Sequence, residues 1–182
     1  MLFRSFTDSA ATKHYLNRAG FFDLLDARID VLPKRPTVSA ARRHHGKSDT
    51  LLEFDSVDPK SDNESLIEGL TNKFVSQATG EYYVAAFTVF GELVGNVVEH
   101  SETPLAGFAG LQRYRGRHKH IQTVVSDSGV GIAKTLRPSL KEHYPVLDRQ
   151  FGRASVAADM GLVAAAMSRG EISRFGGARG RF

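Results

Sequence analysis

The chain has 182 residues, 41% hydrophobic and 24% charged, which suits one globular domain, alone or with a small appendage. It contains no cysteine, which excludes disulfides and thiolate metal sites. We find no apolar run of about 18 residues that would predict a membrane span. Residues 1–10 also lack the pattern of a signal peptide, so we expect a cytoplasmic protein without membrane contact.

The formal net charge is +4, and basic residues concentrate in two segments, 34–47 and 113–119. Clustered cations are typical of proteins that bind the phosphate backbone of nucleic acids. We interpret the first segment as part of a linker and the second as the tip of a hairpin. Since a modest charge spread over two such segments speaks mainly to solubility, the sequence disfavours nucleic acid as a partner.

Residues 1–49 are predicted to form a helical N-terminal segment followed by a basic linker. A helix is expected over residues 9–25, where apolar side chains recur at helical spacing, and the prolines that follow prevent its continuation. Residues 34–49 are polar and rich in turn formers, which predicts a linker or an exposed loop. The apolar residues 21–25 would permit a protein partner or a homodimer contact.

Residues 50–182 are predicted to form the main domain. Its expected elements are strands over 50–54, 107–114 and 120–126, a turn at 115–117, and helices over 62–78, 81–100, 133–136 and 151–168. Ser61 and Glu64 have the spacing of a capping box at the start of the first of these helices. Pro138 is expected to end the short helix before it. This order favours an α+β fold with helices on one face of a mostly antiparallel sheet.

The helix over 81–100 carries one polar stripe, in which residues at i, i+4, i+7 and i+8 share a face. These residues are Glu92, Asn96, Glu99 and His100. The stripe is either the solvated face of an amphipathic helix or a site. Asparagine is a poor helix former, and the stripe contains no lysine or arginine, which favours a site. Gly91 and Gly95 each cost up to about 1 kcal/mol inside a helix, which indicates a close approach there.

Two side chains of this stripe suit phosphate chemistry. Mg²⁺ takes few oxygen ligands from protein and the rest from phosphates and water, so the Asn96 carbonyl is a candidate metal ligand. Glu92 lies one turn earlier and is a candidate catalytic base for an attacking water or hydroxyl.

A glycine loop follows the last predicted strand. Asp127 stands at the strand end, where a carboxylate can accept a hydrogen bond from an exocyclic amine such as that of adenine. Gly129 and Gly131 permit close approach of the backbone to a ligand, and successive amides there can cradle phosphates. The same pattern also occurs in ordinary turns and in calcium loops. No third glycine completes a dinucleotide-binding fingerprint.

The two motifs together resemble a known family. Residues 92–101, Glu-Leu-Val-Gly-Asn-Val-Val-Glu-His-Ser, resemble the N box of the Bergerat-fold ATPases. Residues 126–132, Ser-Asp-Ser-Gly-Val-Gly-Ile, resemble the G1 box. This superfamily includes gyrase, heat-shock chaperone ATPases, sensor histidine kinases, mismatch-repair ATPases and anti-sigma-factor kinases. The pattern is most similar to anti-sigma-factor-kinase-like or stand-alone ATP-binding proteins.

The resemblance implies a two-layer α/β sandwich with a mixed, mostly antiparallel sheet. It implies ATP and Mg²⁺ as cofactors, with Glu92 as general base and Asn96 as the Mg²⁺ ligand. The nucleotide-binding residues that it implies are Asn96, Asp127, Gly129, Gly131, Ile132, Gly177 and Gly180. The last two glycines look like the beginning of a second glycine box. The family pattern continues past the point where this chain stops, so the resemblance covers residues 61–182 with the lid incomplete.

Three functions are open at this stage. In the first, the chain hydrolyses ATP or phosphorylates a protein serine or threonine, and the combination of Glu92 with Asn96 and Asp127 is the motivation. Alternatively, it is a regulatory module that holds ATP without turning it over, which the incomplete lid favours. The third reading is an interaction domain that binds no nucleotide.

Overall fold

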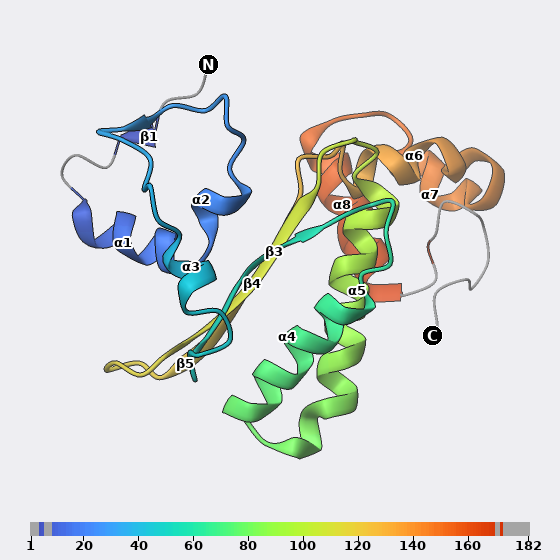
Figure 1. Ribbon diagram of the computed structural model, residues 1–182. Helices are drawn as coiled ribbons and strands as arrows, with labels where there is room; N and C mark the ends of the chain where they lie inside the picture. The colour runs from blue at the N-terminus through green and yellow to red at the C-terminus, as the bar shows by residue number, and fades with distance from the viewer. Residues whose placement is uncertain (1–3, 6–8, 170–171, 173–182) are drawn as a thin grey trace.

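The computed structural model describes residues 4–5, 9–169 and 172, and it shows an α+β fold (Figure 1). The strands are β1 (Arg4–Ser5), β2 (Val31–Leu32), β3 (Leu51–Val57), β4 (Gly107–Tyr114) and β5 (His120–Ser126). The helices are α1 (Ala10–Arg18), α2 (Phe21–Leu24), α3 (Ala40–Arg43), α4 (Glu64–Gln77), α5 (Tyr83–His100), α6 (Ile132–His143), α7 (Pro145–Phe151) and α8 (Val156–Arg169), and a 3-10 turn η1 (Gly80–Tyr82) precedes α5.

The central sheet is antiparallel, with strand order β3-β4-β5. The bounds of β4 and β5 are the ones that the sequence predicts, because the turn residues 115–117 separate the two strands and β5 is rich in β-branched residues. β3 begins and ends later than the expected 50–54. A short parallel pair, β1 with β2, lies in the N-terminal segment.

Helices α4 and α5 cover one face of the sheet and enclose the main core with it. The core residues are Val57, Leu66, Leu70, Ala86, Phe90, Val94, Val97, Ala109 and Leu111. On α5 they recur at intervals of three and four residues, so one side of the helix is apolar and faces the strands. Burying each large aliphatic or aromatic side chain stabilises the fold by roughly 1.5–3 kcal/mol.

The N-terminal segment lies on the opposite face of the sheet, on the other side from α4 and α5 (Figure 1). The Phe54 amide of β3 donates to the Ala19 carbonyl at 2.7 Å. Arg18 forms an ion pair with Glu53, which is buried. The Phe54 ring covers Gly110, where a Cβ would lie 2.6 Å from the ring. The N-terminal segment therefore lies against β3 on this face, whereas the side chains of β5 on the same face are exposed, namely His120, Gln122, Val124 and Ser126.

The helix expected over residues 9–25 is two helices instead of one. Gly20 separates α1 from α2 and has a φ of 88°, a left-handed conformation that glycine adopts at little cost. The break lets the Ala19 carbonyl reach β3. The predicted loop over 34–49 contains a short helix, α3, and the Ser39 hydroxyl caps it by accepting from the Arg42 amide at 3.0 Å.

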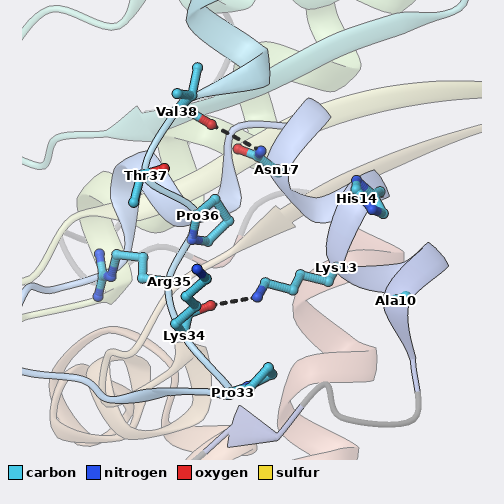
Figure 2. Close-up of a pocket in the computed structure, with 10 residues that line it drawn as sticks. All are labelled: Ala10, Lys13, His14, Asn17, Pro33, Lys34, Arg35, Pro36, Thr37 and Val38. Carbon is cyan, nitrogen blue, oxygen red and sulfur yellow. Dashed lines mark hydrogen bonds between the residues drawn. The ribbon is translucent and has the colours of Figure 1, made fainter.

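An open cavity of about 440 Å³ lies between α1 and residues 33–38 (Figure 2). Two side chains of α1 reach across it to backbone carbonyls. The Lys13 ammonium donates to the Lys34 carbonyl at 2.5 Å, and the Asn17 amide donates to the Val38 carbonyl at 3.1 Å. These bonds fix residues 33–38 to the helix.

The predicted capping box at α4 is wrong. The helix begins at Glu64 with Asn63 before it, and the Ser61 hydroxyl donates to the Asp58 carboxylate at 2.7 Å. The Asn63 side-chain oxygen accepts from the Asp58 amide at 3.1 Å. Asp58 and Asn63 thus hold the turn between them, and Ser61 is not available to the helix amides.

The C-terminal helices depart from the prediction at two prolines. α6 continues through Pro138 to His143, because Leu136 and Leu140 on either side of the proline are anchored in a second core with Leu147 and Leu162. The helix expected over 151–168 is α8, which begins later, at Val156, and the sequence did not predict α7, which starts at Pro145. Gly177 and Gly180 lie outside the described residues. No described helix is long and apolar enough to cross a membrane.

Candidate functional site

The polar stripe of α5 faces solvent, while the other side of the helix is in the core. The exposed residues of the stripe are Glu92, Asn96 and Glu99. The prediction that His100 belongs to the stripe is wrong. Its side chain is buried, and its Nδ1 lies 2.6 Å from the Thr135 hydroxyl. α6 packs over the end of α5, which turns the last residue of the helix into a buried contact.

The two helical glycines of α5 lie beside this stripe. A Cβ added at Gly91 or Gly95 would meet nothing within 4 Å among the described residues. Packing within the described part of the chain therefore does not account for them.

The glycine loop contacts the end of α5 directly. The Val130 amide donates to the Ser101 carbonyl at 2.8 Å. A Cβ at Gly129 would lie 2.1 Å from the Ser101 Cα, which is far inside a van der Waals contact. Only glycine at position 129 therefore permits this approach, and the two predicted motifs meet at Ser101.

Asp127 holds the loop with one of its carboxylate oxygens. Oδ1 accepts from the Gly129 amide at 2.6 Å, and the side chain is exposed. No hydrogen bond to Oδ2 is formed within the described part of the chain. One oxygen thus orients the loop, and the other faces outward, where it can accept a bond from a ligand amine.

The end of the loop leads into α6. Gly131 has a φ of 83°, and the 12-residue helix begins at Ile132 directly after it. A helix N-terminus carries a partial positive charge and amides that suit phosphate. The loop and this helix therefore place an anion-compatible end beside the Asp127 carboxylate.

Ser101 and Thr135 are site residues that the sequence did not predict. Ser101 is 1% exposed, and its Oγ has no hydrogen-bond partner among the described residues. A buried hydroxyl without a hydrogen-bond partner costs about 1–3 kcal/mol. A ligand that forms a hydrogen bond with the Ser101 Oγ would remove this cost. The N-box resemblance ended at Ser101, directly after the predicted helix, but it assigned this serine no role.

The donors present fit a Mg²⁺ ion that is bound mainly through phosphates. Glu92 and Asn96 offer oxygen atoms one turn apart on the exposed side of α5, and Mg²⁺ takes one or two such ligands. No group of three or more His, Asp or Glu side chains suited to a metal occurs in the described residues. Asn96 precedes Ser101 by roughly 7 Å along the helix axis, since each residue rises about 1.5 Å. Within the described residues no hydrogen bond or ion pair joins Glu92 or Asn96 to the loop.

The N-terminal cavity lies apart from these residues. Its lining comes from α1 and residues 33–38 and includes none of the predicted site residues.

Comparisons with known proteins gave no match: no family model fits the chain, and neither curated proteins nor solved structures show significant similarity. The contacts of Ser101 and the glycine loop therefore carry the functional argument.

Proposed function

We propose that this chain binds Mg-ATP between α5 and the loop over 127–131, in a Bergerat-type sandwich. In this proposal the bound nucleotide is hydrolysed or gives its phosphate to a protein. The observation that carries the proposal is the contact of Ser101 with Gly129 and Val130, which holds the two motifs against each other.

The loop supplies the nucleotide recognition. The outward oxygen of Asp127 accepts a hydrogen bond from the adenine amine, while the hydrogen bond from the Gly129 amide holds the carboxylate in place. Gly131 and Ile132 form the turn into α6, whose N-terminus faces the phosphates. Each of these groups belongs to the backbone or to a short side chain, so the site is held without long flexible residues.

The exposed side of α5 supplies the remaining groups. Asn96 offers its carbonyl oxygen to Mg²⁺, which neutralises phosphate charge when bound. Glu92 lies one turn earlier and accepts the proton of the attacking water or hydroxyl. Both roles follow from the resemblance to the family, and both are compatible with the exposure of the two side chains.

A second function, ATP binding without turnover, has one observation in its favour. Glu92 is exposed, and within the described structure no hydrogen bond orients its carboxylate. A base that is not positioned contributes little to proton transfer. Under this alternative the chain is a regulatory module whose conformation responds to ATP.

A Mg-ATP titration of three proteins tests nucleotide binding. Wild type is compared with Asp127→Asn and with the control Asp30→Asn, an exposed aspartate in the N-terminal segment. Asparagine keeps the Oδ1 acceptor for the loop but replaces the outward oxygen with a donor. We expect wild type and the control to gain about 2.7 kcal/mol of stability at a ligand concentration 100 times Kd, and Asp127→Asn to gain little. If none of the three responds, the chain is an interaction domain that binds no nucleotide.

A single-turnover assay separates turnover from binding. Glu92→Gln is expected to slow phosphate release about 100-fold or more while Mg-ATP affinity stays within twofold. Glu68→Gln, an exposed glutamate on α4, is the matched control and should behave as wild type. A wild-type protein that binds Mg-ATP but releases no phosphate would establish the regulatory alternative.

A further inference from the structure

Two basic segments that are far apart in the sequence lie at the same end of the central sheet. β3 starts at Leu51 opposite Gln112 of β4, and the Arg113 amide donates to the Thr50 carbonyl at 2.7 Å. The chain before β3 and the tip of the β4–β5 hairpin therefore leave the sheet together. Figure 1 shows that the chain between α3 and β3 reaches the end of the sheet from which the tip of the β4–β5 hairpin projects.

The end of α4 joins the same region. The Lys73 ammonium donates to the Ser48 carbonyl at 2.6 Å, and the Gln77 amide donates to the Asp49 carbonyl. The Arg113 guanidinium donates to the Gln77 side chain at 3.0 Å. Three separate elements are thus tied to one another at this end of the sheet.

We call this region the basic end and define it by its cations. They are Arg42, Arg43, Lys47, Lys73, Arg113, Arg115, Arg117 and Lys119. Arg42 pairs with Asp23 at 3.4 Å. Five of the others are exposed and form no ion pair among the described residues, namely Arg43, Lys47, Arg115, Arg117 and Lys119. No carboxylate of the described chain is therefore paired directly with them.

An aromatic platform lies at the base of the hairpin tip. Tyr114 and His120 are paired across the strands, and their rings are stacked, with centroids 4.7 Å apart and planes at 16°. Both side chains are exposed. A flat ring surface beside exposed cations is the combination with which proteins bind single-stranded nucleic acid, since the cations follow the phosphates and the rings stack with bases.

Two features of the basic end favour nucleic acid over a membrane surface. Arginine outnumbers lysine among its cations, and the planar guanidinium both pairs with phosphate and stacks on bases. Residues 115–119 contain no apolar side chain that would insert between lipids.

We propose that the basic end binds single-stranded nucleic acid, with phosphates on its exposed cations and a base on the Tyr114–His120 platform. The sequence disfavoured such a partner because its modest net charge is spread over a predicted linker and a hairpin tip. The pairing of β3 with β4 brings these two segments together. The surface is distinct from the proposed nucleotide site, because β5 separates the two by roughly 20 Å at about 3.3 Å per residue.

The first test measures how binding depends on these charges. Fluorescence anisotropy follows a labelled oligonucleotide of about twelve pyrimidines, as DNA and as RNA, over a range of salt concentrations. The variant Arg115→Gln, Arg117→Gln, Lys119→Gln is compared with a control of equal net charge. The control is Lys141→Gln, Arg149→Gln, Arg153→Gln, whose residues are exposed on or just after α6 and α7.

We expect the hairpin variant to bind at least about tenfold more weakly and to reduce the salt slope by about 2, while the control stays within twofold of wild type. Equal losses in the two variants would show that binding follows net charge alone and would overturn the proposal. Comparing the affinities for the DNA and the RNA oligonucleotide shows which of the two nucleic acids the surface prefers.

The second test addresses stacking. Tyr114→Leu is expected to weaken binding about fivefold or more, and Tyr114→Phe, which keeps the ring, should bind within twofold of wild type. An abasic oligonucleotide of the same length should bind Tyr114→Leu and wild type equally. His120→Ala provides a second variant if circular dichroism shows that Tyr114→Leu is misfolded. If ring removal changes nothing and anionic vesicles compete as well as the oligonucleotide, the surface does not recognise nucleic acid.

Discussion

Strand β5 connects two ends of the sheet that differ in charge and in construction. At its C-terminal end lie Asp127 and the glycine loop, and Asp58 follows β3 at the same end of the sheet. At its N-terminal end lie the stacked Tyr114 and His120 and the cations of the hairpin tip. Each end unites segments that are distant in the sequence.

The difference between the ends lies in what holds them. The Asp127 end depends on backbone contacts at Ser101 that tolerate no side chain at Gly129. The basic end presents long exposed side chains around a rigid hairpin. A pocket for a small ligand requires the first kind of construction, because its groups must be placed closely. A surface for a polyanion requires only charge of sufficient density.

The largest expected effect comes from one added methyl group, which should weaken ligand binding at the Asp127 end and leave binding at the basic end unchanged. Gly129→Ala forces the loop away from Ser101, because the new Cβ would lie 2.1 Å from the Ser101 Cα. We expect Mg-ATP affinity to fall about 100-fold or more and stability to fall by roughly 1–3 kcal/mol, as in other overpacked sites. Oligonucleotide affinity at the basic end should stay within twofold.

Gly69→Ala, within α4, is the matched control for this variant, since a Cβ at Gly69 also meets nothing within 4 Å. Calorimetric titration with Mg-ATP and oligonucleotide anisotropy check both ends in the same preparations. Simultaneous loss at both ends would mean that they are not independent.

A smaller effect is expected for the buried contact between α5 and α6. Thr135→Val removes the hydroxyl that lies 2.6 Å from the His100 ring. We expect unfolding free energy in urea to fall by about 1–3 kcal/mol, because a buried polar contact is lost. Thr88→Val, on the exposed side of α5, should change it by less than about 0.5 kcal/mol. Equal effects of the two variants would contradict a special role for the buried pair.

A gain in stability is expected at the helical glycine nearest Asn96. Gly95→Ala should raise unfolding free energy by up to about 1 kcal/mol, since alanine favours the helix and its methyl meets no described atom. Ala85→Gly, at an exposed position of the same helix, should lower it by a similar amount. Urea denaturation of both variants provides the measurement. A loss of stability in Gly95→Ala would refute the open environment of this position.

The smallest expected effect is the pH dependence of stability that arises from Tyr15, a residue that interacts with Tyr114 at the basic end. Burial, followed by the charge and the hydrogen bond of Tyr114, raises the pKa of Tyr15 to about 12. Unfolded tyrosine titrates near pH 10. The stability that this shift contributes is therefore present below about pH 10 and is lost as pH rises through about 12.

Tyrosinate absorbance and urea unfolding of wild type and Tyr15→Phe measure this titration. The variant should lose less stability than wild type between these pH values. A Tyr15 that titrates near pH 10 would contradict the raised pKa.

The elements that the sequence predicts well are those defined by their own residues. The β4–β5 hairpin follows from the turn residues 115–117 and the β-branched residues of β5, and α5 follows from its apolar spacing up to His100. The contact of Gly129 with Ser101 was not predictable in detail, because it depends on how the hairpin returns the chain to the end of α5.

The wrong predictions share a cause, which is a tertiary contact that overrides a local preference. Pro138 fails to end α6 because buried leucines on both sides hold the helix in place. His100 leaves the polar stripe because Thr135 approaches it. The joining of the two basic segments depends on strand pairing between β3 and β4, which no local pattern encodes.

The hydrogen bond from the Phe54 amide to the Ala19 carbonyl ties the N-terminal segment to β3. That segment also carries Arg43 and Lys47, whereas the other half of the basic end belongs to the hairpin. An oligonucleotide that binds both halves links them, and it raises the effective concentration of one half near the other. The protection of the Phe54 amide from deuterium exchange measures how often the N-terminal segment detaches from the sheet. An oligonucleotide that links the two halves should therefore increase this protection.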